Sequence, residues 1–230
     1  MNSEWVRLYV TVEGPTEKKF ADETLCPHLA LFSIDLRPRI VITNRKLGAR
    51  GGGQYYETIQ GDLARLMRED ASSKARFSTM VDLYALPLHF PGKADAERMT
   101  EAVTKVEHLE AAWATAVADR RFIPFIQLHE FEALLYCDLA ELEKRIENAT
   151  AGITALRREV GHLAPEAINE GPTTAPSKRI IRHVPAYQFN KPRVGAPAAS
   201  AIGLSVLRQK CPHFSQWITK LENLGSPIQA

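Results

Sequence analysis

The chain has 230 residues, of which 45% are hydrophobic and 24% are charged. These values are typical of a globular protein with a sizeable core, and they exclude disordered, collagen-like and disulfide-scaffold proteins. The 29 Lys and Arg residues against 27 Asp and Glu residues leave a formal net charge of +2. Because this balance produces no global positive field, any nucleic-acid site has to be a local basic patch.

The cysteines and the N-terminus bear on the cellular compartment. Cys26, Cys137 and Cys211 are far apart and odd in number, which fits buried reduced thiols better than disulfides or a zinc site. Residues 1–14 lack the basic and apolar regions of a signal peptide, and no apolar run approaches the ~20 residues of a membrane span. We therefore expect a cytoplasmic protein with no membrane association.

The first 148 residues alternate between strand and helix patterns. Short runs rich in β-branched and aromatic residues predict strands at residues 7–12, 39–43, 77–86 and 121–128. Helical spacing of apolar residues follows each strand, at residues 15–29, 55–69, 97–119 and from 133 onward. This alternation predicts an α/β domain over residues 1–148, with a mostly parallel, four-stranded central sheet flanked by helices.

The composition changes after Asn148: prolines become frequent, and no further run rich in β-branched residues occurs. Short helices are expected at residues 153–161, 176–184, 198–210 and 213–224. Residues 149–230 are therefore predicted to form a helical, loop-rich extension packed on the sheet.

Acidic residues follow three of the predicted strands. Glu13 ends the first strand, with Glu17 one helical turn later, and Asp82 lies near the end of the third strand. Glu130 and Glu132 follow the fourth strand beside His129. Ligands of open α/β sheets bind outside the carboxyl ends of strands, and carboxylates there can hold Mg²⁺ or Mn²⁺. The pattern indicates a divalent-metal site for phosphoryl transfer or phosphodiester hydrolysis.

Each of these residues also has a purely structural interpretation. Glu17 would suit a helix N-terminus, Asp82 a turn after a strand, and one of Glu130 and Glu132 the start of a helix. His129 would equally serve as a hydrogen-bonded structural residue.

Basic residues are concentrated in two segments. Arg45, Lys46 and Arg50 flank a glycine-rich loop that lacks the order of a phosphate-binding P-loop. The second segment contains Lys178, Arg179, Arg182, Lys191 and Arg193. Either set would neutralise phosphates, or would simply form a connection or a solvated surface.

An ordered set of motifs carries a resemblance to a known family. These motifs are VEGPTE after the first strand, MVDLYALP after the third, IQLHEFEALL after the fourth, and later INEGPTTAPSKRI, IGL and CPHFxxW. From about Arg7 to Leu224 the chain resembles the bacterial Toprim-like family called domain of unknown function 4276. Toprim domains are the metal-binding catalytic modules of topoisomerases, primases and overcoming-lysogenization-defect nucleases.

The resemblance implies roles for individual residues. Glu13 and Glu17 would be the acids of the first-strand motif, and Asp82 would be the first Asp of the Toprim D-x-D. Tyr84 stands at the second position of that motif, so Glu130 or Glu132 would replace the missing ligand. Lys178 resembles the basic residue near the scissile phosphate, and the family's gene context implies an ATPase partner.

Together these patterns favour a Toprim-like, Mg²⁺- or Mn²⁺-dependent nuclease subunit acting on DNA or RNA in defence against phage. Glu13, Asp82 and Lys178 would be catalytic, Glu13, Glu17, Asp82 and Glu130 would bind the metal, and Arg45, Lys46, Arg50, Lys178 and Arg179 would bind nucleic acid. The alternatives are a non-catalytic docking or nucleic-acid-binding subunit and a metal-dependent phosphatase. Homo-oligomerisation is left open.

Overall fold

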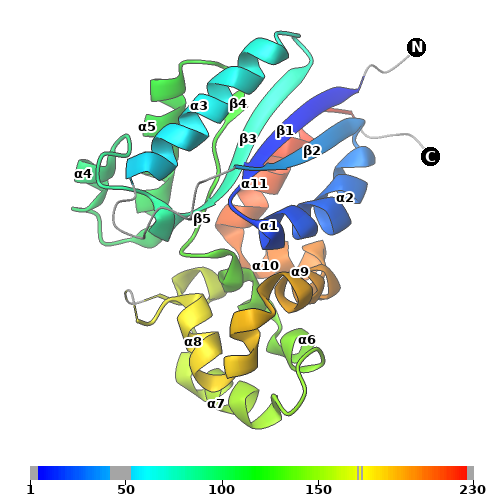
Figure 1. Cartoon of the computed structure of the whole chain (residues 1–230), viewed down its shortest axis with the longest axis vertical. Coiled ribbons are helices and arrows are strands. Elements are labelled where there is room, and N and C mark those ends of the chain that lie inside the picture. Colours follow the sequence, from blue (N-terminus) through cyan, green and yellow to red (C-terminus); the bar gives the residue numbers. More distant parts are fainter. Residues whose placement is uncertain (1–4, 42–52, 170, 172, 227–230) are drawn as a thin grey trace.

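The computed structural model describes residues 5–41, 53–169, 171 and 173–226, which fold around a parallel sheet flanked by helices (Figure 1). The strands are β1 (Val6–Val12), β2 (Ile34–Ile40), β3 (Ala75–Asp82), β4 (Phe122–Ile123) and β5 (Ile126–Gln127). Their order is β2-β1-β3-β4, β5 also pairs with β3, and every pairing is parallel. The predicted α/β class with a parallel central sheet is confirmed.

Helical segments make up most of the remaining described chain. Those between the strands are α1 (Pro15–Phe20), the π-helical η1 (Ala21–Leu25), α2 (Cys26–Ala30), α3 (Gly53–Glu69), the 3-10 turn η2 (Leu83–Ala85), α4 (Lys93–Ala96) and α5 (Ala102–Val117). Those after β5 are the 3-10 helix η3 (Phe131–Cys137), α6 (Leu139–Glu143), α7 (Thr150–Val160), the 3-10 turn η4 (Pro165–Ala167), α8 (Pro176–His183), the 3-10 helix η5 (Pro185–Phe189), α9 (Lys191–Ile202), α10 (Leu204–Lys210) and α11 (Pro212–Glu222).

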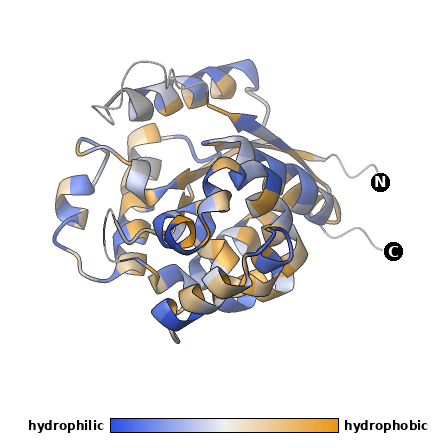
Figure 2. Ribbon diagram, turned by 60° about the horizontal axis from the view of Figure 1, so that its bottom comes forward, coloured by the Kyte–Doolittle hydropathy of each residue, from blue (hydrophilic) through white to orange (hydrophobic). Residues whose placement is uncertain are grey.

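Alternation along the strands divides the core into two layers. In β1, alternate residues from Val6 to Val12 face the layer that contains α1, α2 and α11, whereas Tyr9 faces the opposite layer with α3 and α5. The helices carry both hydrophilic and hydrophobic residues along their length (Figure 2), as expected for helices with one buried side. No helix in the described part of the chain is both long and apolar enough to span a bilayer.

The position of β2 differs from the prediction. The strand spans Ile34–Ile40 rather than residues 39–43, of which 42 and 43 lie outside the described residues. Asp35, Arg37 and Pro38 interrupt the apolar pattern that was used to find strands. They are tolerated because β2 is at the edge of the sheet, where a proline need not donate a ladder hydrogen bond.

The predicted fourth strand is divided at Pro124. β4 and β5 pair with β3 in the same register, so they are two parts of one interrupted strand beside β3. Between them the Thr79 hydroxyl accepts from the Phe125 N–H and donates to the Phe125 carbonyl, both at 3.0 Å. The side chain therefore replaces backbone pairing where the strand is broken.

A third difference follows β5, where one helix was predicted from residue 133. The chain instead forms η3 and α6, separated at Asp138. The Asp138 carboxylate accepts from the Ala140 N–H at 3.0 Å, so it caps the start of α6.

The C-terminal helices share a core with the sheet. Trp217 of α11 stacks on Phe125, with ring centroids 4.2 Å apart, and its indole N–H donates to the Ser78 hydroxyl at 2.9 Å. Buried residues from before and after residue 148 belong to the same apolar cluster. The division into residues 1–148 and 149–230 stays a prediction.

Replacing Thr79 with Val should destabilise the protein by roughly 2–3 kcal/mol, because two buried backbone groups of Phe125 lose their partner. The measurement is the midpoint of urea unfolding. Thr115→Val is the matched control, since that hydroxyl is exposed and bonds only within α5; it should change stability by less than about 0.5 kcal/mol. Equal losses in the two variants would contradict the assigned role of Thr79.

Candidate functional site: a carboxylate cavity at the strand ends

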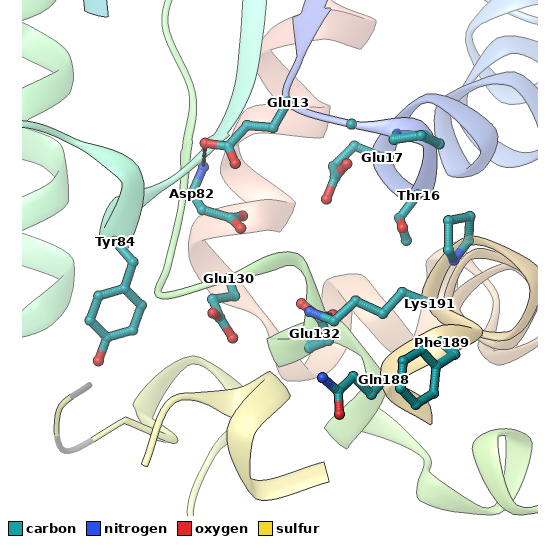
Figure 3. A pocket seen from close by; sticks show the side chains of 13 residues that line it. Glu13, Thr16, Glu17, Asp82, Tyr84, Glu130, Glu132, Gln188, Phe189 and Lys191 are labelled. Carbon is teal, nitrogen blue, oxygen red and sulfur yellow. Dashed lines mark hydrogen bonds and ion pairs between the residues drawn. The ribbon is translucent and has the colours of Figure 1, made fainter. Parts of the chain in front are cut away.

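Acidic side chains from three strand ends meet in one cavity of about 480 Å³ (Figure 3). Glu13 follows β1, Asp82 ends β3, and Glu130 and Glu132 follow β5, while Glu17 comes from α1. They meet because the carboxyl ends of parallel strands lie at the same edge of the sheet. The cavity is lined by Glu13, Gly14, Pro15, Thr16, Glu17, Asp82, Tyr84, Glu130, Glu132, Gln188, Phe189, Lys191 and Pro192.

Backbone N–H groups hold the carboxylates of neighbouring strand ends. The Asp82 N–H donates to Glu13 Oε1 at 3.1 Å, and the Phe131 N–H donates to Asp82 Oδ1 at 2.9 Å. The acidic side chains thus tie β1, β3 and the segment after β5 to one another.

The carboxylates of Glu130 and Glu132 are held by the C-terminal helices. Glu130 Oε2 accepts from the Ser177 N–H at 2.8 Å, at the N-terminus of α8, where the helix dipole favours negative charge. Glu132 Oε1 lies 2.8 Å from Lys191 Nζ and accepts from the Tyr187 hydroxyl at 3.2 Å. The helical extension therefore forms the second wall of the cavity.

Close packing brings α1 to this wall. A Cβ on Gly195 of α9 would lie 2.7 Å from the Tyr187 hydroxyl oxygen and 3.5 Å from Thr16 Cγ2 of α1. The absence of a side chain at Gly195 thus leaves room for the Tyr187 hydroxyl, and α1 lies within van der Waals reach of this position. Thr24 Oγ1 adds a 2.7 Å hydrogen bond to Ser200 Oγ of α9. The contact fixes Glu17 on the same side of the cavity as Lys191.

Burial and repulsion by neighbouring carboxylates raise the pKa values of Asp82 and Glu17. The pKa of Asp82 lies well above its usual range, because the carboxyl is desolvated and faces Glu13, Glu17, Glu132 and Glu130. Burial raises the pKa of Glu17 to about 7, and Glu13 and Glu132 add to this effect against opposing backbone hydrogen bonds. Full ionisation of all the carboxyl groups in the cluster is therefore unfavourable.

Lys191 offsets part of this charge. Burial lowers its pKa, but Glu132, Glu130 and Asp82 outweigh burial and leave the pKa above its ordinary value. Among the described residues that line the cavity, Lys191 is the one cationic side chain. It therefore stays protonated beside five carboxyl groups.

The donor set suits a hard divalent cation in its chemistry. The described lining residues offer carboxylate oxygens and no thiol or imidazole, which favours Mg²⁺ or Mn²⁺ over softer metals. As the side chains stand, however, no three described Asp, Glu, His or Cys residues form a group that could hold a metal ion. Binding would require some of the carboxylates to move closer together than they are in this structure.

The other residues singled out from the sequence lie elsewhere. Lys178 is exposed on α8 and does not line the cavity. Arg179 is buried, pairs with Glu159, and donates from Nε to the Thr174 carbonyl at 2.7 Å, so its guanidinium holds α8 in place. Arg45, Lys46 and Arg50 lie outside the described residues.

His129 does not line the cavity either. It is buried with a φ of 66°, and Nε2 lies 2.9 Å from the Glu166 carbonyl oxygen. The Glu166 carboxylate accepts from the His213 and Phe214 N–H groups at the start of α11. His129 thus contacts the segment that anchors α11, which fits the structural interpretation.

The lining residues Lys191, Gln188 and Phe189 were not among the site residues predicted from the sequence. Lys191 appeared only as one of several basic residues, whereas the family resemblance favoured Lys178. Gln188 and Phe189 lie in a loop-like segment with no periodic pattern. The signal that identifies all three is spatial, because α9 and η5 reach the strand ends only through tertiary packing.

The family model described as domain of unknown function (DUF4276) matches residues 12–222, so the chain belongs to that family. A search of curated proteins gives no match. A solved structure, the C-terminal region of the OLD protein of Xanthomonas campestris pv. campestris, is similar at 14% identity, with 93% of this chain and 96% of that chain covered. Its TM-score of 0.33 does not establish a shared fold, so the Toprim relationship stays a prediction.

Replacing Glu17 with Gln should stabilise the protein at pH 8 by roughly 2–3 kcal/mol and have little effect at pH 4. The folded state raises the Glu17 pKa to about 7, so it binds the proton more tightly than the unfolded state does. The contribution of Glu17 to the free energy of unfolding therefore falls as the pH rises from about 4.5 to 7. Gln does not ionise, so the variant does not lose this contribution.

The measurement is urea unfolding at several pH values in the presence of a chelator. Glu23→Gln is the control, because Glu23 lies on the adjoining η1 segment but is exposed, and its side chain pairs with Lys19. A Glu17→Gln variant that is less stable than wild type at both pH values would contradict the electrostatic account.

Proposed function

We propose that the protein hydrolyses phosphodiester bonds in nucleic acid with the aid of Mg²⁺ or Mn²⁺ held in the carboxylate cavity. The observation that carries the proposal is the convergence of five carboxyl groups and one lysine at the carboxyl ends of a parallel sheet. Ligands of open α/β sheets bind at this edge. Oxygen donors in such number are the donor set of metal-assisted phosphoryl chemistry.

Charge is the main reason to include a cation. The acidic cavity by itself repels a phosphate. Burial raises the pKa of Asp82, and the charges of the neighbouring carboxylates raise it further. Glu13 and Asp82, together with Glu17 or Glu130, would hold the cation. When bound, such an ion polarises the phosphoryl group and lowers the pKa of a bound water.

The chain's own residues would position the substrate. Lys191 Nζ is paired with Glu132 at 2.8 Å, yet about a third of the lysine side chain remains exposed in the cavity. Its charge can therefore approach a phosphate oxygen and offset charge that develops there. We place Lys191 in the role that the family resemblance suggested for Lys178.

Tyr84 supports an alternative, a non-catalytic docking or nucleic-acid-binding subunit. It occupies the position where the resemblance implies a second Asp, and its ring lines the cavity without supplying a carboxylate. Its hydroxyl instead donates to Asn169 Oδ1. Under the main proposal Glu130 or Glu132 supplies the carboxylate that Tyr84 lacks. The ATPase partner and the role in phage defence are included in the proposal on the family resemblance alone.

Cleavage of labelled oligonucleotides and supercoiled plasmid should require Mg²⁺ or Mn²⁺ and should fall at least about 100-fold in Asp82→Asn and in Glu13→Gln. Lys191→Met should reduce the rate by roughly tenfold or more, because the cavity loses the positive charge of the lysine side chain. Lys178→Met should have a smaller effect, since that side chain lies outside the cavity.

Lys105→Met, on α5, serves as a control for surface charge, and each variant is checked by circular dichroism. Cleavage that persists in both acid variants would contradict the proposal. Metal-independent, salt-sensitive binding without cleavage, even with the partner ATPase added, would favour the non-catalytic alternative.

A further inference from the structure

Phe189 is the more exposed of the two aromatic residues that line the carboxylate cavity in the described part of the chain. The chain contains nine phenylalanines, all within the described residues, and Phe189 is 83% exposed while the other eight are buried or half-buried. It ends η5 and lines the same cavity as the acidic side chains. A planar aromatic ring that is exposed beside a cavity offers a face on which another planar group can stack.

The segment that carries Phe189 is anchored firmly. Tyr187, two residues earlier, is fully buried and donates to Glu132 Oε1 at 3.2 Å. The Asn190 N–H donates to the Tyr187 carbonyl at 3.0 Å immediately after the ring. Because Glu132 belongs to the carboxylate cavity, Phe189 is held in a defined position beside the acids.

A second aromatic ring lies across the cavity. Tyr84 is 40% exposed and lies on the other side of the carboxylates from Phe189 (Figure 3). Gln188 lies next to Phe189 and lines the cavity with an amide that can both donate and accept hydrogen bonds. Flat apolar faces and an amide flank the acidic centre.

These features match the chemistry of a nucleobase. Aromatic side chains stack on bases in a sequence-tolerant way, with about 1–3 kcal/mol per base. A base inside a duplex is already stacked and paired, so it presents no free face to a ring at the rim of a cavity. A cavity of about 480 Å³ is within the range of sites for single small ligands, which a nucleotide would suit.

We propose that Phe189 stacks on a nucleobase next to the reacting phosphate, so that the substrate is a nucleic-acid strand with unpaired bases. The position of the phosphate rests on the proposed function, whereas the stacking itself can be measured without catalysis. Phe189 is a binding residue in this proposal, and it sets the preference for single strands over duplex.

The test is fluorescence anisotropy of the full chain with a labelled 12-nucleotide single strand and with the matching duplex, in Ca²⁺. Phe189→Ala should raise the Kd for the single strand about tenfold or more and change the Kd for the duplex less than threefold. Phe189→Trp should keep the Kd for the single strand within about threefold of wild type, because it retains a stacking face. Leu163→Ala removes another exposed apolar side chain, away from the cavity, and should change neither Kd.

A mononucleotide competitor distinguishes two sources of the same base. If Phe189→Ala weakens both the mononucleotide and the single strand, the subsite accepts any unpaired nucleotide; if it weakens only the strand, a polynucleotide is required. Both results support stacking. Equal Kd values for wild type and Phe189→Ala, an equal loss for single strand and duplex, or no single-strand binding by wild type would overturn it.

Cleavage of the same oligonucleotides in Mn²⁺ separates this inference from the proposed function. If wild type cuts nothing but Phe189→Ala still weakens single-strand binding, the hydrolase proposal fails and the stacking inference stands. If wild type cuts the oligonucleotides and Phe189→Ala binds the single strand as tightly as wild type, the stacking inference fails and the hydrolase proposal stands.

Discussion

Repulsion among carboxylates is the constraint on which the organisation of this protein depends. A parallel sheet brings its carboxyl ends to one edge, and here three of those ends supply acidic side chains to one partly buried cavity. Burial of the Asp82 carboxyl raises its pKa well above the usual range, and the like charges of the neighbouring carboxylates add to this, so the fully ionised state is disfavoured. The surrounding structure has to compensate for that repulsion.

The compensation comes from both halves of the chain. The Asp82 and Phe131 N–H groups bind acids from neighbouring strand ends, and the Ser177 N–H at the start of α8 binds Glu130. Lys191 on α9 supplies the opposite charge. The helices after residue 148 are therefore part of the cavity, and what remains of the negative charge is the basis for proposing a bound divalent cation.

Local sequence patterns were sufficient for features that depend on short stretches of chain. The apolar runs at residues 7–12 and 77–86 identified β1 and β3, although β3 spans Ala75–Asp82 and the 3-10 turn η2 follows it directly. Glu13 and Asp82 are among the acidic residues that the structure brings together. β2 was misplaced because the strand pattern is blurred at a sheet edge, where charged residues and Pro38 are tolerated. The break at Pro124 was missed because its repair by Thr79 is a contact between distant segments.

Long-range packing also explains what the sequence did not reveal about the cavity. Lys178 and Lys191 are equivalent by composition, and only the turn between α8 and α9 decides that the second one reaches Glu132. Hydropathy alone would assign Phe189 to the core. It is exposed instead, and Tyr187, two residues earlier in the same segment, is the aromatic side chain that is buried and bonded to Glu132. Such choices depend on the whole fold rather than on neighbouring residues.

The measurement that tests the central claim most directly is Mn²⁺ binding at pH 8, followed by the electron paramagnetic resonance signal of free Mn²⁺. The account predicts saturable binding to the wild-type chain, with a Kd at least about tenfold higher in Asp82→Asn and unchanged in Glu23→Gln, both variants being folded by circular dichroism. An absence of saturable binding to wild type, or equal Kd values for wild type and Asp82→Asn, would contradict the claim that the carboxylate cavity holds a divalent cation.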